Sequence, residues 1–225
     1  MIKITSIPNF KEWYDTVVNF EDINVDFNST AIKVQMKDPS NSFLISSHLE
    51  LPVENTCNAS ISIENLKTIK EAVDVYWTSD SLIFKCGITK YKTGILKDPK
   101  VDALILPELP QVKFNLVTAN IPQELIKEMV KVSEREENIV FKNDGTNLLV
   151  SDDTGSIETT YENVLEHGDI PVKCIFSFSY INNVIKVMKY FEKVTLKVGY
   201  DMPIIIELRK PGFSIDYWIA PRIED

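Results

Sequence analysis

Two acidic turns are the segments of this sequence whose residue types and spacing could support catalysis. Asp152-Asp153-Thr154-Gly155 could offer paired carboxylates to a divalent metal ion, and Asp38-Pro39-Ser40-Asn41 contributes a further carboxylate. Both segments stand between alternating runs, where Asp and Gly are favoured for backbone reasons. Each is therefore interpreted as a turn, and a metal-dependent α+β hydrolase built on these carboxylates stays open as an alternative.

Other catalytic signatures are missing from the sequence. It has no Gly-rich phosphate loop, no nucleophile elbow and no His-Glu-x-x-His helix, and neither His48 nor His167 has an arranged partner. The three cysteines, Cys57, Cys86 and Cys174, are widely spaced and odd in number, which fits neither a disulfide framework nor a zinc motif. The sequence therefore offers little support for catalysis, a cofactor or a bound metal ion, and a protein without enzymatic activity is what the family resemblance given below implies.

Lysines on the polar sides of predicted helices offer a different chemistry, the binding of phosphate groups. With about 100° between successive residues, Lys127 and Lys131 fall together, nearly opposite an apolar stripe. Lys186 and Lys189 lie on the polar side of another helix, which has no acidic residue. Solvated amphipathic helices also carry lysines, which is the alternative interpretation. The lysines considered for a phosphate-facing role are Lys11, Lys67, Lys70, Lys127, Lys131, Lys186 and Lys189.

Composition bounds the class of protein. The chain has 225 residues, of which 44% are hydrophobic, enough for a core in one large or two small domains. Its 24 basic and 33 acidic side chains give a formal net charge of -9. This charge excludes a generally basic nucleic-acid coat but allows a basic lining inside an acidic shell. The sequence has neither a run apolar enough for a membrane span nor a signal peptide, so we expect a cytoplasmic or nuclear protein.

Short alternating runs rich in Val, Ile, Phe and Thr predict a chain made mostly of strands. Four stretches with the helical period interrupt them, at about 8–19, 62–73, 121–132 and 179–190. The fold class is therefore α+β, mostly antiparallel sheet with few helices. The predicted strands are Ile2–Thr5, Ile23–Phe27, Ala31–Gln35, Ser42–Leu49, Leu82–Gly87, Lys113–Val117, Ile139–Phe141, Leu148–Ser151, Val194–Val198, Ile204–Leu208 and Phe213–Ala220.

An internal repeat organises these elements. The segment Ile2–Thr5 before the first helix resembles Val112–Asn115 before the third. After the second and fourth helices come the similar strands Leu82–Gly87 and Val194–Gly199. The chain is therefore predicted to hold two copies of one unit, each with two helices and many strands.

A connector at about 97–110 joins the two copies. Its three prolines prevent a regular helix or a central strand, so the segment is expected to be extended. It is nonetheless apolar over Ala103–Leu106, where an ordinary solvated linker would be polar. The connector either packs on a core or borders a groove that a partner fills.

Four motifs resemble those of archaeal and eukaryotic sliding clamps of the proliferating cell nuclear antigen (PCNA) family, and they occur along the chain in the same order as in that family. The tail at 216–225 resembles the family's Leu-Ala-Pro-Lys/Arg-Ile-Glu ending, and 199–207 resembles its Gly-x-Asp-x-Pro segment. Leu106-Pro107-Glu108-Leu109-Pro110 is similar to the archaeal connector. The segment 38–45 resembles the family's Asp-Ser-Ser-His-Val segment, with Asn41 in place of the histidine.

This resemblance implies two topologically similar clamp domains, with antiparallel sheets outside and four helices lining the inside. The domains would cover 1–103 and 111–225, with 104–110 as the end of the connector. A homotrimer or heterotrimer would close a ring around duplex DNA, which it would bind without sequence preference. It would tether DNA polymerase, a clamp loader and other proteins that carry a clamp-interacting peptide, as a processivity factor in DNA replication and repair. No membrane association is implied, and a clamp-like monomer that never closes a ring is the alternative.

The resemblance also implies two protein interfaces. Subunits would join through strands near Tyr91–Leu96 of one copy and Ile157–Tyr161 of the next, and a proline at Ile157 is expected to give monomers. The corresponding interface residues are Tyr91, Leu96, Ile157 and Tyr161. The partner peptide would enter a pocket under the connector, formed by Asn41, Phe43, Leu44, Leu104, Ile105, Leu106, Pro107, Ile219, Ala220, Pro221 and Arg222.

Overall fold

The computed structural model describes both halves of the chain. The described residues are 2–5, 7–17, 24–28, 30–38, 40, 42–51, 59–62, 74–78, 80–95, 117–121, 137–162, 165–167, 172–200 and 202–222. The connector at 97–110 and nearly all of the helices predicted at 62–73 and 121–132 lie outside these residues.

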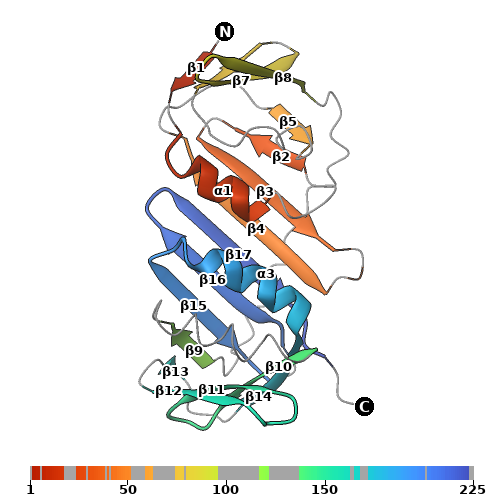
Figure 1. Cartoon of the computed structure of the whole chain (residues 1–225), viewed down its shortest axis with the longest axis vertical. Coiled ribbons are helices and arrows are strands. Elements are labelled where there is room, and N and C mark those ends of the chain that lie inside the picture. Colours follow the sequence, from red (N-terminus) through yellow and green to blue (C-terminus); the bar gives the residue numbers. More distant parts are fainter. Residues whose placement is uncertain are drawn as a thin grey trace. The chain divides into compact units, whose positions relative to one another are not determined.

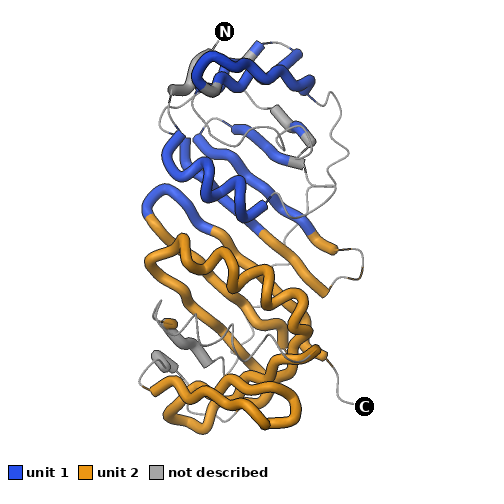
Figure 2. The backbone as a smooth tube through the Cα atoms, viewed as in Figure 1, with its two compact units in different colours: residues 1–36, 46–105, 211–214 blue, residues 37–45, 106–210, 215–225 orange. Residues whose placement is uncertain are grey.

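The chain forms two compact units (Figure 2). Unit 1 comprises 1–36, 46–105 and 211–214, and unit 2 comprises 37–45, 106–210 and 215–225. The main division falls between 105 and 106, inside the predicted connector. Each unit also includes one short segment from the other half of the chain: 211–214 belongs to unit 1, and 37–45 belongs to unit 2. The predicted domains, 1–103 and 111–225, did not include this exchange of segments.

In its described residues, unit 1 combines one helix with antiparallel strands (Figure 1). Its elements are β1 (Ile2–Thr5), α1 (Phe10–Val17), β2 (Asn24–Phe27), β3 (Ala31–Lys37), β4 (Phe43–Glu50), β5 (Ala59–Ser62), β6 (Asp74–Trp77), β7 (Ser81–Cys86) and β8 (Thr89–Gly94). Four strands form a sheet in the order β1-β6-β7-β8, and the others follow the order β4-β3-β2-β5. Strands β7 and β8 form a hairpin whose turn includes Gly87 at φ 61°, a left-handed conformation that glycine adopts without steric cost.

The core of unit 1 gathers around helix α1. Phe10, Trp13 and Val17 recur at helical spacing and are buried, with Trp13 fully so. The ring of Phe84 on β7 lies 6.5 Å from that of Phe10 and 6.0 Å from that of Phe27 on β2. Apolar burial of this kind is the main force holding the helix on the strands.

The segment 211–214 completes unit 1. The Glu50 N–H donates to Gly212 O at 2.8 Å, and Asn9 Nδ2 donates to Pro211 O at 3.0 Å. Asn9 has φ 59°, a left-handed conformation that asparagine tolerates because its short amide forms local hydrogen bonds. The donors of Asn9 and Glu50 therefore find their hydrogen-bond acceptors in a segment more than 150 residues later in the chain.

Unit 2 has a similar composition of strands and helix. Its elements are β9 (Val117–Asn120), β10 (Asn138–Asn143), β11 (Leu148–Asp152), β12 (Glu158–Tyr161), β13 (Leu165–His167), β14 (Val172–Ser177), α3 (Phe178–Met188), β15 (Lys193–Val198), β16 (Ile204–Lys210) and β17 (Phe213–Ile219). The strands follow the orders β12-β11-β10-β14 and β13-β9-β15-β16-β17. Figure 1 shows α3 lying over strands β15–β17. Its buried residues include Ile181, Val184, Ile185 and Met188, the apolar stripe that the sequence predicts.

The predicted fold class, α+β with mostly antiparallel sheet, is confirmed. Helix α3 and most of the predicted strands occur within two residues of their expected bounds. The predicted start of the second helix at 62 is wrong, because Ser62 pairs with Asn24 as the last residue of β5. None of the described helices has the length and apolar character that crossing a bilayer requires.

Candidate functional site

Helix α3 presents a stripe of polar side chains that contains no acidic residue. Ser179, Asn183, Lys186 and Lys189 are exposed, and their spacing places them on one side of the helix. Lys189 directly follows the last helical residue, and its Nζ lies 4.9 Å from the ring centroid of Tyr190. The prediction that Lys186 and Lys189 lie on the polar side is confirmed, and their contact with phosphate stays a prediction.

The other candidate lysines divide into two groups. Lys11 on α1 is exposed, but its Nζ lies 3.0 Å from Asp15 Oδ2 in an (i, i+4) ion pair. The carboxylate offsets the lysine charge, so Lys11 is a weaker phosphate ligand than the α3 lysines. The remaining candidates, Lys67, Lys70, Lys127 and Lys131, lie outside the described residues.

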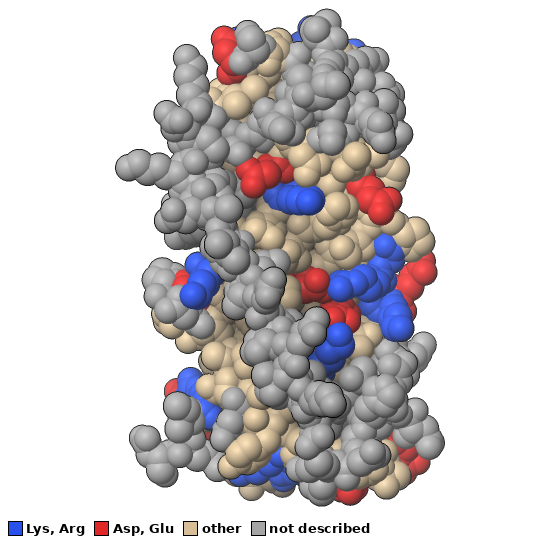
Figure 3. Space-filling model, turned by 180° about the vertical axis from the view of Figure 1, so that it is seen from behind, with Lys and Arg blue, Asp and Glu red and all other residues tan. Residues whose placement is uncertain are grey.

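The other face of β15–β17 carries charges of both signs. Lys197 pairs with Glu207 across β15 and β16, and Arg209 pairs with Asp216 on β17. Desolvation by burial raises the pKa of Asp216, and the Arg209 guanidinium opposes that rise. Figure 3, seen from behind, shows basic and acidic side chains next to one another. Such a mixed surface attracts phosphate less than the acid-free stripe of α3.

Asp152 is a turn residue in the hairpin between β11 and β12. Its carboxylate accepts hydrogen bonds from Thr154 Oγ1 at 3.0 Å and from the Ile157 N–H at 3.3 Å. Desolvation acts to raise its pKa, but these hydrogen bonds outweigh it and the pKa of Asp152 is lowered. The interpretation of 152–155 as a turn is confirmed. Within the described ranges, no three His, Cys, Asp or Glu side chains gather as metal ligands.

Asp38 ties the β3–β4 turn to helix α3. Its carboxylate accepts hydrogen bonds from the Phe43 N–H at 2.8 Å, from the Tyr180 hydroxyl at 2.9 Å and from the Ser40 hydroxyl. The rings of Phe43 and Tyr180 stack with centroids 5.4 Å apart and planes 9° from parallel. Desolvation opposes the effect of these donors, and the pKa of Asp38 is lowered. The predicted turn at 38–41 is thus confirmed, and a helix fixes its position.

Removing the Tyr180 hydroxyl should loosen this turn. We expect Tyr180→Phe to lower the free energy of unfolding by about 1 kcal/mol at neutral pH, because it deletes one hydrogen bond to a carboxylate. The pKa of Asp38 is depressed in the folded state, so its stabilisation is present above the unfolded pKa and is lost as pH falls through the folded pKa. Urea unfolding at about pH 7 and about pH 2 should therefore show a difference only at the higher pH.

The matched control is Tyr200→Phe, which removes the hydroxyl of a tyrosine that is 73% exposed. It should leave the unfolding free energy unchanged at both pH values. A loss for Tyr180→Phe of the same size at both pH values would show that ring packing, and not the bond to Asp38, is responsible.

The described part of the predicted peptide pocket lies where β17 ends beside the start of β4, within unit 2. The Ala220 N–H donates to Ser42 O at 2.8 Å, which brings the tail next to the first-domain segment. Phe43, Leu44 and Ile219 are buried and pack in the core of unit 2. The accessible predicted residues are Ala220 and Pro221, which are half-buried, and Arg222, which is exposed. Asn41, Leu104, Ile105, Leu106 and Pro107 lie outside the described residues. Peptide binding here stays a prediction.

Trp218 is a residue of this surface that the sequence reasoning missed. Side chains alternate along a strand, so Trp218 shares the half-exposed side of β17 with Ala220, whereas Ile219 points to the core. The indole Nε1 is buried and has no hydrogen-bond acceptor in the part of the chain that the structure describes. An unmatched buried donor costs free energy, and this nitrogen is itself shielded from solvent. The sequence could have indicated this, because Trp218 lies two positions before Ala220 on an alternating strand and therefore shares its face.

Strands β8 and β12 each form one edge of a four-stranded sheet, with β1 and β14 at the opposite edges, as far as the described residues show. They coincide with the strands expected to join subunits, near Tyr91–Leu96 and Ile157–Tyr161. Tyr91 and Ile157 are half-buried, and Leu96 lies outside the described residues. Tyr161 is only 1% exposed, so its ring belongs to the core of unit 2 and only its strand can take part in a contact. The subunit interface stays a prediction.

The hydrogen bonds of the β11–β12 hairpin show which backbone groups face its open edge. The Asp152 N–H donates to Ile157 O at 3.2 Å, so these two residues form a bonded pair. Bonded and non-bonded pairs alternate, so Thr159 also bonds towards β11, while Glu158 and Thr160 turn their N–H and C=O groups to the edge. The Ile157 N–H donates to Asp152 Oδ1 within its own hairpin, so a proline there would also disturb that hairpin, and its effect on the subunit contact stays a prediction.

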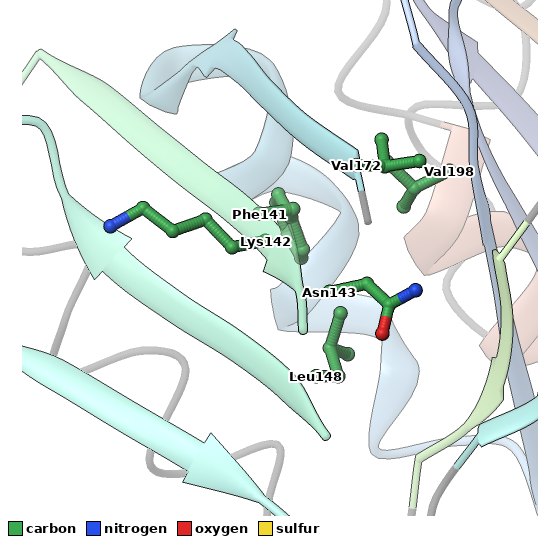
Figure 4. Close-up of a pocket in the computed structure, with 6 residues that line it drawn as sticks. All are labelled: Phe141, Lys142, Asn143, Leu148, Val172 and Val198. Atoms are coloured by element: carbon green, nitrogen blue, oxygen red, sulfur yellow. The ribbon is translucent and has the colours of Figure 1, made fainter. Parts of the chain in front are cut away.

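A small hollow lies between β10, β11, β14 and β15 of unit 2 (Figure 4). Its volume of about 150 Å³ includes open solvent and leaves almost no room for a water molecule, whereas sites for small molecules usually measure roughly 300–1,000 Å³. The Asn143 side chain accepts a hydrogen bond from the Gly145 N–H at 2.7 Å, and Lys142 points away from the hollow in Figure 4. The hollow is therefore a gap in packing. Its lining consists of Phe141, Lys142, Asn143, Leu148, Val172 and Val198.

Comparison with known proteins identifies the family. A family model described as the C-terminal domain of proliferating cell nuclear antigen matches residues 96–222, more than half of the chain. The chain belongs to the proliferating cell nuclear antigen (PCNA) family. It is 23% identical over 236 residues to DNA polymerase sliding clamp 2 of Thermococcus kodakarensis, covering 92% of this chain and 90% of that relative. It is also 23% identical to PCNA of Caenorhabditis elegans over 237 residues, covering 91% and 89%.

Solved PCNA structures share the fold along nearly the whole chain. PCNA from Thermococcus kodakaraensis superposes with a TM-score of 0.78 at 18% sequence identity, covering 98% of this chain and 99% of that structure. PCNA from Entamoeba histolytica gives a TM-score of 0.78 at 17% identity and covers 98% of both chains. The predicted PCNA-like fold, with its α+β clamp domains, is confirmed.

Proposed function

We propose that this chain is one subunit of a ring-shaped DNA sliding clamp, a processivity factor that encircles duplex DNA and tethers DNA polymerase to it. The observation that carries the proposal is a PCNA family match joined to an exposed helix stripe of lysines without acidic residues. A ring that slides needs contacts that are electrostatic and independent of base sequence, and lysine–phosphate contacts have this character. The task is mechanical, so the protein is not an enzyme, and it acts inside the cell where DNA is replicated.

Ring closure would use one edge of each four-stranded sheet, strand β8 in unit 1 and strand β12 in unit 2. Edge strands with unpaired N–H and C=O groups are templates for pairing with another chain. Joining β8 of one subunit to β12 of the next satisfies both edges at every junction of a trimer. Because the two strands differ, the contact is head-to-tail, and three such contacts would give the closed trimer.

Partner proteins would dock on the surface beside the end of β17. Trp218 and Ala220 face the half-exposed side of that strand, and the Trp218 N–H has no acceptor among the described residues. A short helical peptide with aromatic anchors could bury its apolar side chains there and under the connector. DNA polymerase, the clamp loader and other replication or repair proteins would share this site in turn.

Retention on circular DNA tests the proposal. The protein is loaded with the clamp loader of the same organism onto nicked circular DNA, and the complex is separated from free protein by gel filtration at moderate salt. A clamp should stay with the circle and be lost once a restriction enzyme linearises it, because only an end allows a closed ring to leave. Equal retention on circular and linear DNA would instead show binding to the outside of the duplex.

A further inference from the structure

Two backbone hydrogen bonds within unit 2 hold the proposed docking surface in place. This surface consists of Trp218, Ala220, Pro221 and Arg222. The Ala220 N–H donates to Ser42 O at 2.8 Å, which attaches the surface to the start of β4. The Arg222 N–H donates to Ile175 O at 2.8 Å, which attaches it to β14, the strand that leads into helix α3. The arrangement of the surface therefore depends on how firmly each of these two acceptors is held.

Tyr180, in the first turn of α3, holds the acceptor at Ser42. Its hydroxyl donates to Asp38 Oδ2 at 2.9 Å, and its ring stacks on that of Phe43. Asp38 Oδ1 accepts the Phe43 N–H at 2.8 Å, and the Asp38 N–H donates to Phe43 O at 2.9 Å. Ser42 directly precedes Phe43 in this turn. The contacts of Tyr180 with Asp38 and Phe43 therefore fix the carbonyl group that receives the Ala220 N–H.

A row of aromatic rings makes the same connection through the core of unit 2. The ring centroid of Phe43 lies 5.4 Å from that of Tyr180 on α3 and 5.8 Å from that of Tyr217 on β17. Tyr217 is buried and directly precedes Trp218 of the docking surface. Aromatic contacts of this kind stabilise beyond the area that they bury. The rings keep α3, β4 and β17 together, and the Tyr180 hydroxyl can be removed without changing their packing.

We propose that Tyr180 is a positioning residue for partner binding, which holds the β3–β4 turn, and through Ser42 the end of β17, in the arrangement that accepts a peptide. This role rests on the docking surface proposed above and adds a residue that acts on it through Asp38 and Phe43. A surface that is ordered before binding loses less conformational entropy when the peptide arrives, so its affinity is higher. Helix α3 then serves the docking surface with its first turn, in addition to carrying the lysines proposed to contact DNA.

Amide hydrogen exchange, followed by NMR on the full chain, tests the positioning without a partner. In Tyr180→Phe, the Ala220 amide should exchange about fivefold faster than in the wild type, because its acceptor at Ser42 is held less firmly. The Arg222 amide is an internal control, since its acceptor at Ile175 is not part of the turn, and its exchange should be unchanged. Equal exchange of the Ala220 amide in the variant and the wild type would overturn the proposal.

Calorimetric titration tests the consequence for partner binding. The probe is a synthetic peptide with the sequence of the clamp-interacting segment of a DNA polymerase from the same organism. We expect Tyr180→Phe to raise its dissociation constant about threefold to tenfold. In a chain that already carries Asp38→Ala, the same tyrosine change should have no further effect, because the acceptor of its hydroxyl is gone. A loss of affinity that persists in that background would show that the tyrosine does not act through the turn.

The matched control is Val150→Ala on β11, a fully buried position of unit 2 that β10 separates from β14. It should lower the stability by at least as much as Tyr180→Phe and leave the peptide affinity unchanged. An equal loss of affinity in this control would assign the effect to general destabilisation and overturn the positioning role. If Tyr180→Phe binds the peptide like the wild type, the positioning role is wrong and the docking surface stands. A wild type that is retained on circular DNA but does not bind the peptide would overturn both, and the clamp would stand.

Discussion

Replacing Thr160 by proline should leave the protein folded but monomeric. Thr160 is exposed, and the ladder of β12 turns its N–H towards the open edge and away from β11. Proline removes this donor and places its ring where a neighbouring strand would bond. In solution the mass should fall from about three times 25.7 kDa to that of one chain. Retention on circular DNA should be lost with it, because an open monomer cannot encircle a duplex.

Thr159→Pro separates this effect from damage to the hairpin. The Thr159 N–H bonds towards Val150 on β11, so a proline there breaks the subunit's own sheet. We expect a lower melting temperature for Thr159→Pro and a nearly unchanged one for Thr160→Pro. A trimeric Thr160→Pro variant with wild-type stability would show that β12 is not the joining strand.

Reversing the charge of the α3 lysines should nearly abolish processive DNA synthesis. The double variant Lys186→Glu/Lys189→Glu places two carboxylates on a helix stripe that otherwise has no acidic residue. A trimer carries this change once in each of its three subunits. Repulsion of phosphate replaces attraction, so we expect the average product length on a loaded template to fall roughly tenfold at moderate salt. Adding Lys127→Glu and Lys131→Glu, the predicted lysines of the third helix, should deepen the loss.

The control is Lys173→Glu/Lys193→Glu, which makes the same charge change at two exposed strand positions of unit 2. Product length should stay at the wild-type value if position, and not net charge, decides the effect. Trimer mass is measured alongside, so that loss of assembly is not mistaken for loss of DNA contact. Processive synthesis by the α3 variant equal to that of the wild type would show that this helix does not face DNA.

Strong alternation made the central strands predictable from sequence. β16 and β17 were expected at Ile204–Leu208 and Phe213–Ala220 and occur at Ile204–Lys210 and Phe213–Ile219, because each buries a continuous apolar face. The edge strands lack this alternation of buried and exposed residues, so it does not predict them. The sequence Thr-Lys-Tyr-Lys-Thr-Gly of β8 buries little more than Thr93, so its strand was expected only through the family resemblance.

The candidate site was predictable in position but less so in orientation. The apolar period of α3 fixed which side carries Lys186 and Lys189, since a helix face follows from spacing alone. The family motif placed Ile219 in a pocket, yet the alternation of β17 turns it into the core and presents Trp218 instead. A family motif therefore predicts which segment forms a site, whereas the alternation of side chains along the strand decides which of its residues are accessible.

The exchanged segment 211–214 has a consequence for how the chain is made. A ribosome releases the chain from residue 1 onwards, so most of unit 1 leaves it long before Pro211 and Gly212 are translated. Until then, the Glu50 N–H and the Asn9 amide lack the carbonyl groups that accept their hydrogen bonds in the finished protein. The first unit to be synthesised is therefore completed only when translation is almost over, and folding intermediates on the ribosome should expose this part of unit 1 to chaperones.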